Sequence, residues 1–327
     1  MTTSKTAIAA AATALSLALS AGAAQAQMKW DMPTPYPDSN FHTKNIRQFV
    51  ADIAKGTGGK LQITVHPANS LIKHPEIKRA VQTGQVPIAE VLTSILSNEA
   101  AVYAFDSNPF LAPTSAQQKK LWAAAKPHIS KRLGAQGIEI LYTVAWPPSA
   151  IHTKKEINSL ADFKGVKMRT YSAITSRFAE LIGSTPTLVN APEVAQAFKT
   201  GIIDAQINSP AGGVDTQTYD FTTHLYDAGV IAPQNMVIVN KAAWAKLDAA
   251  TQKAIKAAAA AAEKRGWDVR EKENAQNLNT LASKGVKIVK PSAKLAAEFA
   301  AVGKKMTAEW AAKAGAEGDA ILKAYNK

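Results

Sequence analysis

Strand patterns alternate with helical patterns along most of this chain, and this alternation limits the possible folds more than any other feature of the sequence. Residues 61–66 place apolar side chains at every second position, as in a half-buried strand, directly after an amphipathic helical pattern at 43–55. Residues 137–145 form a second, more fully buried strand pattern. Alternation of this kind predicts an α/β fold.

The longest helical pattern, residues 248–281, is rich in Ala, Lys, Gln and Glu. A helix of this length spans ~45 Å or more, which exceeds one small lobe, so we expect it either to kink or to run across two lobes. Residues 146–148, Trp-Pro-Pro, follow the buried strand and predict a crossing between lobes, although Pro also simply terminates strands.

The first 26 residues have the three parts of a secretory signal peptide. Lys5 supplies the positive charge, residues 7–21 are mostly apolar, and Ala24-Gln25-Ala26 forms a cleavage site. The apolar stretch is shorter than the ~20 residues of a membrane anchor. We therefore expect a periplasmic protein whose mature chain begins near Gln27.

Neither the charge nor the cysteine usage indicates a disulfide-stabilised or nucleic-acid-binding protein. The chain has no Cys, so its hydrophobic core alone must stabilise it, without disulfides. Its net charge is +13, but the Lys and Arg residues are scattered rather than clustered with aromatic residues. We expect no nucleic-acid partner, and we expect a monomer.

The usual catalytic signatures are missing from the sequence. There is no G-x-S-x-G motif and no Cys nucleophile. Residues 56–60, Gly-Thr-Gly-Gly-Lys, resemble a phosphate loop, but they follow a helix and precede a strand, which is the reverse of the required order. The six histidines include no pair at metal-ligand spacing. The sequence thus predicts no catalytic residue, no metal and no cofactor.

The segment with the clearest chemical potential is the strand pattern at 166–170, which has Arg169 at its carboxyl end. Ligands of open α/β sheets bind at those ends, and an Arg there can hold a carboxylate through two parallel N–H donors. A surface or structural ion pair is the alternative interpretation of the same residue.

Asn208 ends a second strand pattern, at 202–208, and its amide can both donate to and accept from a ligand. A turn Asn before Ser-Pro is the alternative. Between these strands, Asn190 followed by Glu193 forms a capping pattern that predicts a helix from there to Lys199.

Six segments carry a family resemblance through their order and spacing. They are Thr57-Gly58-Gly59-Lys60-Leu61, Val81-Gln82-Thr83-Gly84-Gln85-Val86, Asn108-Pro109-Phe110-Leu111, the run from Leu160 to Arg169, the run from Pro192 to Asp204, and Val239-Asn240-Lys241-Ala242-Ala243-Trp244. Behind a signal peptide, this set resembles the solute-binding subunits of tripartite ATP-independent periplasmic (TRAP) transporters, the DctP family. The likeness covers essentially the whole mature chain.

The resemblance implies two α/β lobes, joined by crossing strands and a long helix, that close on a ligand like a clam shell. Lobe I is expected to comprise 27–146 plus about 235–273, and lobe II 147–234 plus about 274–327. The resemblance also implies that Arg169 forms a bidentate salt bridge with a ligand carboxylate, that Asn208 is a second ligand contact, and that the partners are the membrane subunits of a TRAP transporter.

The ligand class follows from one departure from the family pattern. Relatives that bind sialic acid have another Arg about twenty residues before the hallmark Arg, whereas residues 146–152 contain none. We therefore expect a small monocarboxylate, such as a keto, hydroxy or aromatic acid, with a C4-dicarboxylate as the alternative.

Further ligand contacts are expected from aromatic and acidic residues. Trp146 could form a flat apolar wall, and Tyr36, Phe41 and Tyr171 are candidates that belong to the core in the alternative interpretation. Glu90 ends a strand pattern at 86–90 and could accept a hydrogen bond from a ligand.

Two other function classes remain open at this stage. A secreted hydrolase or isomerase would need a nucleophile or an acid–base pair, and the sequence offers no candidate. A sensor protein could use the same fold to present its ligand to a membrane receptor.

Overall fold

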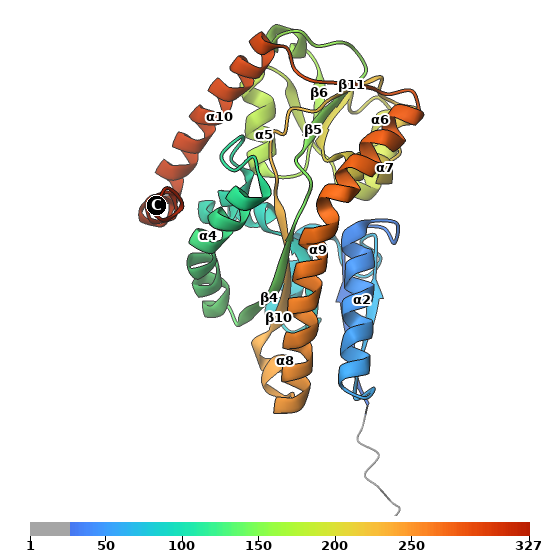
Figure 1. Cartoon of the computed structure of the whole chain (residues 1–327), viewed down its shortest axis with the longest axis vertical. Helices are drawn as coiled ribbons and strands as arrows, with labels where there is room; N and C mark the ends of the chain where they lie inside the picture. Colours follow the sequence, from blue (N-terminus) through green and yellow to red (C-terminus); the bar gives the residue numbers. More distant parts are fainter. Residues whose placement is uncertain (1–26) are drawn as a thin grey trace, which may run out of the picture.

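The computed structural model describes residues 27–327. The predicted signal peptide, residues 1–26, lies outside the described residues. Two lobes, each built around its own β-structure, lie one above the other in Figure 1, with helices packed around them. The predicted two-lobed α/β architecture is confirmed.

Lobe I is the lower half of Figure 1. Its strands are β1 (Met28–Pro33), β2 (Leu61–His66), β3 (Ile88–Leu92), β4 (Ile138–Ala145) and β10 (Gln234–Asn240), its α-helices are α2 (Phe41–Gly56), α3 (Ile77–Gln82), α4 (Ser115–Ala135) and α8 (Lys241–Ala245), and its 3-10 helices span His74–Glu76, Thr93–Asn98 and Ala101–Ser107. Strands β1 and β2 form a parallel pair, and β3-β10-β4 form an antiparallel sheet. The apolar face of α2, with Ile46, Phe49 and Ile53, is buried, as its periodicity predicts.

Lobe II contains one six-stranded sheet. Its strands are β5 (Ala150–Thr153), β6 (Lys167–Thr170), β7 (Thr185–Leu188), β8 (Ala205–Asn208), β9 (His224–Tyr226) and β11 (Lys287–Val289), its α-helices are α5 (Ala173–Leu181), α6 (Val194–Lys199) and α7 (Pro210–Asp215), and its 3-10 helices span Leu160–Phe163, Ala191–Glu193 and Thr218–Asp220. The strand order is β11-β9-β5-β8-β6-β7. Strands β6 and β8 are parallel neighbours, so their carboxyl ends meet at one edge of the sheet.

Two extended segments connect the lobes, one from β4 to β5 and one from β9 to β10. They pair with each other: Trp146 N donates to Pro233 O at 2.8 Å, Ser149 N donates to Ile231 O at 2.6 Å, and Val230 N donates to Ser149 O at 2.9 Å. The predicted crossing after Trp146 is therefore confirmed.

Helix α9 (Ala249–Ser283) is a third connection, continuous over 35 residues. Figure 1 shows it running from α8 in lobe I to β11 in lobe II. It packs closely on β4 at Gly266, where an added Cβ would lie 2.4 Å from a methyl group of Val144. Of the two expectations for this segment, a helix that spans both lobes is the correct one.

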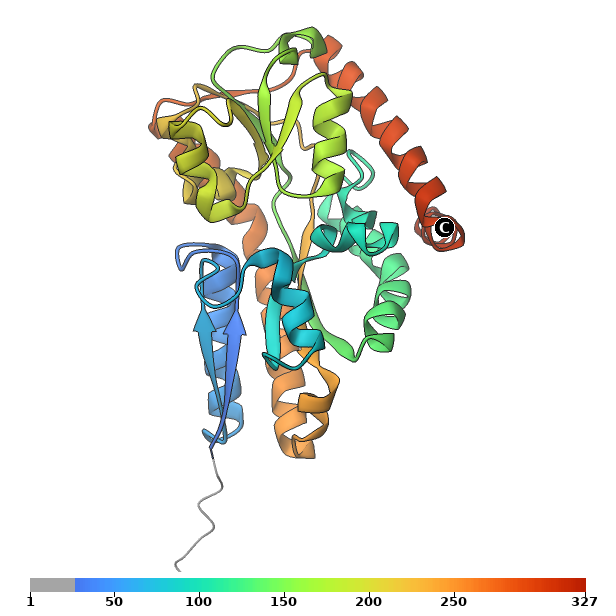
Figure 2. The ribbon, with the colours of Figure 1, turned by 180° about the vertical axis from the view of Figure 1, so that it is seen from behind.

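The last two helices, α10 (Ala293–Ala314) and α11 (Ala316–Tyr325), return the chain to lobe I, as the red end of the ribbon in Figure 2 shows. The α10 helix packs against α5, and α11 packs against α4. Arg132 of α4 pairs with Glu317 of α11, and the hydroxyl of Tyr325 donates to Leu111 O at 2.9 Å. The predicted division of the chain stays a prediction, and these contacts favour placing α11 with lobe I.

Among residues 27–327, no helix has both the length and the apolar character needed to cross a membrane.

The predicted helix start at Asn190 is partly confirmed. Asn190 has the extended backbone angles of an N-cap, but it precedes a short 3-10 turn, its side chain makes no capping hydrogen bond, and α6 begins only at Val194. Pro192 fits this tight turn because its φ angle is already fixed. The Asn190 side chain lines a cavity instead.

Candidate functional site

A cavity of about 200 Å³ lies between the two lobes. From lobe I and the crossing segments it is lined by Tyr36, Pro37, Ala68, His74, Leu92, Trp146, Ser149 and Pro233, and from lobe II by Arg169, Tyr171, Asn190, Ala191, Pro192, Ala195, Asn208, Ser209, Gly212, Asp215, Thr216 and Gln217. Its size admits a small molecule, and its mostly apolar wall with a few polar groups is typical of ligand sites.

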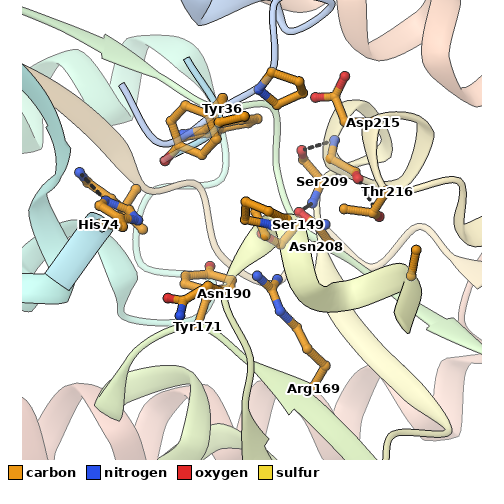
Figure 3. Close-up of a pocket in the computed structure, with 18 of the residues that line it drawn as sticks. Tyr36, His74, Ser149, Arg169, Tyr171, Asn190, Asn208, Ser209, Asp215 and Thr216 are labelled. Atoms are coloured by element: carbon orange, nitrogen blue, oxygen red, sulfur yellow. Dashed lines mark hydrogen bonds between the residues drawn. The ribbon is translucent and has the colours of Figure 1, made fainter. Parts of the chain in front are cut away.

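Arg169 lies at the floor of this cavity, on β6, and is 3% exposed. Its Nε donates to Val189 O at 2.9 Å, and one terminal nitrogen lies 3.4 Å from Ile207 O. Figure 3 shows the guanidinium pointing into the cavity beside Asn208. Among the described residues, no carboxylate pairs with it, so its remaining donors are available to a ligand.

Burial lowers the pKa of Arg169 to about 10. The group therefore remains charged at neutral pH, in surroundings that give it little solvation. Its guanidinium carbon lies 5.3 Å from the centre of the Tyr171 ring, a cation–π distance. A buried cation without a counter-ion is costly, and an anionic ligand would remove that cost.

Asn208 lies beside Arg169, at the end of β8, and also lines the cavity. Its Oδ1 accepts from the Ser209 backbone N–H at 3.0 Å, and its Nδ2 is 3.4 Å from Gln206 Oε1. Gly212 leaves the space that the Asn208 amide occupies, because a Cβ there would lie 2.1 Å from Oδ1. The sequence prediction that Arg169 and Asn208 face one site thus agrees with their positions.

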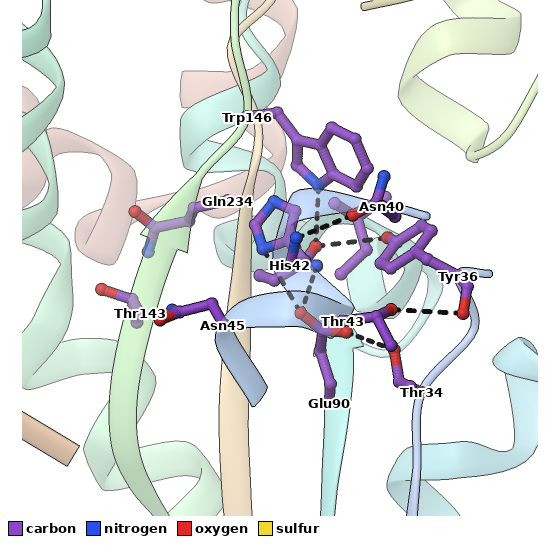
Figure 4. A network of polar contacts seen from close by, with 12 residues as sticks. Thr34, Tyr36, Asn40, His42, Thr43, Asn45, Glu90, Thr143, Trp146 and Gln234 are labelled. Carbon is purple, nitrogen blue, oxygen red and sulfur yellow. Dashed lines mark hydrogen bonds and ion pairs between the residues drawn. The ribbon is translucent and has the colours of Figure 1, made fainter. Parts of the chain in front are cut away.

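The opposite wall is formed by Trp146 and Tyr36, whose rings meet edge to face with centroids 4.8 Å apart. Both donate to the same acceptor, Asn235 Oδ1, at 3.0 Å from Trp146 Nε1 and 3.3 Å from the Tyr36 hydroxyl. Asn235 therefore fixes the orientation of both rings, which are labelled in Figure 4. No local sequence pattern indicated this role, since Asn235 lies within a strand of lobe I.

Glu90 does not line the cavity, and its predicted contact with the ligand is corrected here. It is 2% exposed, and it lies behind the aromatic wall, in the middle of β3 rather than at its end. Its two oxygens accept from Asn235 Nδ2, at 2.8 Å, and from Thr34 Oγ1, and His42 Nδ1 lies 3.4 Å away. Glu90 supports the wall through Asn235.

Phe41 is likewise absent from the cavity wall. It is 4% exposed and packs behind Trp146, with ring centroids 5.4 Å apart. Tyr171, in contrast, does line the cavity, and burial raises its pKa to about 12. Of the candidate wall residues, Trp146, Tyr36 and Tyr171 lie at the site, whereas Phe41 belongs to the core.

Two titratable residues that line the cavity, His74 and Asp215, were missed by the sequence interpretation. His74 Nε2 accepts from the Leu92 backbone N–H at 3.2 Å, which leaves the ring proton on Nδ1. Burial lowers the pKa of His74 to about 4, so the ring is neutral at pH 7. Asp215, at the end of α7, is the second residue, and burial raises its pKa.

Another histidine, His152 of β5, makes the stability of the protein dependent on pH. It is fully buried, and burial lowers its pKa from 6.5 to about 4. The unfolded chain therefore binds this proton at a higher pH than the folded chain does. The stabilisation is complete above pH 6.5 and is lost as pH falls toward 4.

We expect the free energy of unfolding to fall by about 2 kcal/mol between pH 7 and pH 5 from His152 alone, at about 1.4 kcal/mol for each pH unit below 6.5. Urea unfolding at both values should show this loss in the unaltered protein and a smaller loss in His152→Gln. The partly exposed His66→Gln serves as control. Equal pH dependence in the unaltered protein and His152→Gln would contradict the assignment.

Comparison with known proteins identifies the family. The model for bacterial extracellular solute-binding proteins of family 7, DctP, matches residues 34–314. DctP7 of Bordetella pertussis, an extracytoplasmic solute receptor binding pyroglutamic acid, is 44% identical; the match covers 92% of this chain and 100% of that one, with a TM-score of 0.90.

Of two other relatives, one binds the same compound and the other is named for a different ligand. A TRAP solute-binding protein from a marine metagenome, in complex with co-purified pyroglutamate, is 38% identical over 92% of this chain and 99% of its own, with a TM-score of 0.90. The C4-dicarboxylate-binding periplasmic protein DctP of Rhodobacter capsulatus is 25% identical, over 74% of each chain. The family match covers most of the chain, and we conclude that this periplasmic protein belongs to family 7 of the bacterial extracellular solute-binding proteins, the DctP family of TRAP solute receptors.

Proposed function

We propose that this protein captures a small monocarboxylate, with pyroglutamate as the favoured ligand, and delivers it to the membrane subunits of a TRAP transporter. The observation that carries the proposal is the buried charge of Arg169, which faces the cavity without a counter-ion among the described residues. A carboxylate that accepts two parallel hydrogen bonds from it supplies the missing charge.

The charges around the cavity favour one carboxylate over two. Arg169 is the only Lys or Arg among the described residues that line it, and the one acidic residue is Asp215. A second carboxylate of a C4-dicarboxylate would find no cation and would be repelled by Asp215. The dicarboxylate alternative therefore becomes the main comparison in the binding test.

Pyroglutamate fits the remaining polar groups by its chemistry. Its lactam ring carries one N–H donor and one C=O acceptor besides the carboxylate. Asn208 can donate to the carbonyl, and the Asp215 carboxylate or the Thr216 hydroxyl can accept from the N–H. The relatives that bind this compound, at 38% and 44% identity, support the same choice.

Binding of this kind requires no covalent chemistry. A carboxylate docks on Arg169 in the open form, and lobe closure then excludes water and strengthens the charge-assisted hydrogen bonds. Closure is a ligand-driven shift between two populations, and the closed form is the one that membrane subunits would recognise. We therefore expect no catalysis, and we expect bound ligand to be recovered chemically unchanged after long incubation with the protein.

A thermal-shift screen tests the ligand class. L-pyroglutamate at 100 times its Kd should stabilise the native state by about 2.7 kcal/mol and raise its Tm, because ligand binds only the folded protein. Succinate, pyruvate, lactate and benzoate at equal concentration form the comparison set, and calorimetry then gives Kd. A larger shift with succinate than with pyroglutamate would reject the monocarboxylate proposal.

The role in transport is tested separately from binding. Uptake of labelled L-pyroglutamate should require this protein together with TRAP membrane subunits in a reconstituted system. Binding without uptake would instead favour the alternative of a sensor that presents its ligand to a membrane receptor. Gel filtration with light scattering tests the expectation of a monomer.

A further inference from the structure

The two lobes meet at the mouth of the cavity through a polar contact that involves Asp215. This residue ends α7 of lobe II, and its carboxylate lies against the segment that begins α2 of lobe I. Ser39 Oγ donates to Asp215 Oδ1 at 2.9 Å, and Asn40 Nδ2 donates to Oδ2 at 2.5 Å. Figure 1 shows α7 directly above the start of α2.

The first turn of helix α2 provides no negative charge at the N-terminus of the helix. Asn40 is its N-cap residue and accepts from the His42 backbone N–H at 2.8 Å, but the first turn contains no acidic residue. Helix N-termini favour negative charge, which is usually supplied by Asp or Glu of the same helix. Here Asp215 supplies it from the other lobe.

Asp215 also lines the cavity, so the same carboxylate faces both the enclosed space and the opposing lobe. Burial raises its pKa, and the hydrogen bonds from Asn40 and Ser39 act in the opposite direction. Without these donors, the carboxylate would be enclosed with too few hydrogen-bond partners, which is unfavourable. These two hydrogen bonds therefore favour the arrangement in which Asp215 of lobe II lies against the start of α2 in lobe I.

We propose that Ser39 and Asn40 are positioning residues that clasp the Asp215 carboxylate when the lobes close, so that they set how long a ligand stays enclosed without touching it. The inference rests on the proposed function of the cavity as the ligand site. It adds that the dissociation rate of the ligand is controlled from α2, at the rim of lobe I, as well as from the floor of the cavity.

Asn40→Asp isolates this contact. Asp is as good an N-cap as Asn, so α2 keeps its cap, but the donor to Asp215 is replaced by a repelling carboxylate. We expect L-pyroglutamate to dissociate at least about tenfold faster, since two charge-assisted hydrogen bonds are lost or weakened. Stopped-flow tryptophan fluorescence measures this rate, and an unchanged Tm without ligand shows that the fold is intact.

Two further variants provide the matched comparisons. Asn40→Asp combined with Asp215→Asn restores one donor and one acceptor in exchanged positions, so it should recover the ligand-free closed population that Asn40→Asp loses, a measurement that does not depend on any ligand contact of Asp215. Asp38→Asn alters a neighbouring charge that pairs with Arg47 rather than with Asp215, and it should leave the rate unchanged. Rates within twofold of the unaltered protein in Asn40→Asp, or no recovery of the ligand-free closed population in the double variant, would overturn the proposal.

Lobe closure can be measured without relying on the proposed ligand. The chain has no Cys, so spin labels on cysteines introduced at the exposed positions Gln48 in α2 and Lys199 in α6 report the distance between lobes. Asn40→Asp should reduce the closed population with and without L-pyroglutamate. If the unaltered protein shows no response to L-pyroglutamate, the proposed ligand is wrong, and the ligand-free distances alone decide the clasp: an unchanged closed population would overturn it.

Discussion

Arg169→Ala is expected to weaken the binding of L-pyroglutamate by about 3–5 kcal/mol, the range found when one partner of a buried charge pair is removed. The ligand carboxylate would then be enclosed without a cation and without its two strongest donors. At about 1.4 kcal/mol per factor of ten, this corresponds to a loss of at least a hundredfold in Kd.

Arg169→Lys separates charge from geometry. Lysine keeps a positive charge but lacks the planar pair of donors that matches a carboxylate. It also lacks the Nε–H that holds the side chain on Val189 O. We expect an affinity between those of the unaltered protein and Arg169→Ala, and isothermal titration calorimetry on all three proteins measures the order.

Stability provides the check on these variants. Burial of an uncompensated charge is unfavourable, and burial already lowers the pKa of Arg169 to about 10. Removing the charge should therefore not unfold the protein, and the Tm without ligand should stay close to its original value. Unchanged affinity in Arg169→Ala would reject the carboxylate site, whatever the ligand.

Gly212→Ala is expected to have the second-largest effect, because its Cβ would lie 2.1 Å from Asn208 Oδ1 and 2.6 Å from two further atoms of the same amide. The Asn208 side chain must leave its position or α7 must shift. Overpacking costs 1–3 kcal/mol, and this contact is close enough for us to expect about 3 kcal/mol of lost stability, together with weaker ligand binding.

A double-mutant cycle tests the origin of that loss. With Asn208→Ala the amide is removed, so the added methyl group of Gly212→Ala has space and its cost should fall below about 1 kcal/mol. Urea unfolding of the four proteins measures the coupling. Gly134→Ala, where the nearest atom is the flexible end of Lys241 at 3.2 Å, is the control; equal costs of Gly212→Ala in both backgrounds would contradict the packing argument.

The sequence was sufficient to assign Arg169 and Asn208 to one site, but it was not sufficient to place Glu90. Arg169 and Asn208 could be assigned to one site because each ends a strand pattern, and the carboxyl ends of parallel neighbouring strands share an edge. Glu90 was misplaced by the same reasoning. The strand at 86–90 was expected to end at Glu90, but β3 runs from Ile88 to Leu92, so the residue lies in mid-strand.

The wrong assignments have a common physical reason. The type of a residue near a strand end indicates whether its side chain is apolar or polar. It does not indicate whether that side chain faces the interior of a lobe or the cavity between the lobes. Phe41 and Glu90 both face the interior of lobe I, where Trp146 and Asn235 separate them from the cavity. Asn190 precedes a 3-10 turn and makes no capping hydrogen bond with its side chain, which lines the cavity instead.

The sequence by itself determined the α/β class and the position of the long helix, because periodicity is a local property of a chain. It also placed Arg169 and Asn208 at strand ends, whereas their roles as ligand contacts were expected from the family resemblance. Only the tertiary structure decided which of the candidate aromatic residues line the cavity opposite Arg169 and which further residues join them. His74, Asp215 and the Ser39–Asn40 clasp come from separate segments in both lobes. Their proximity results from the way in which the lobes pack across the cavity, and no spacing along the chain encodes that arrangement.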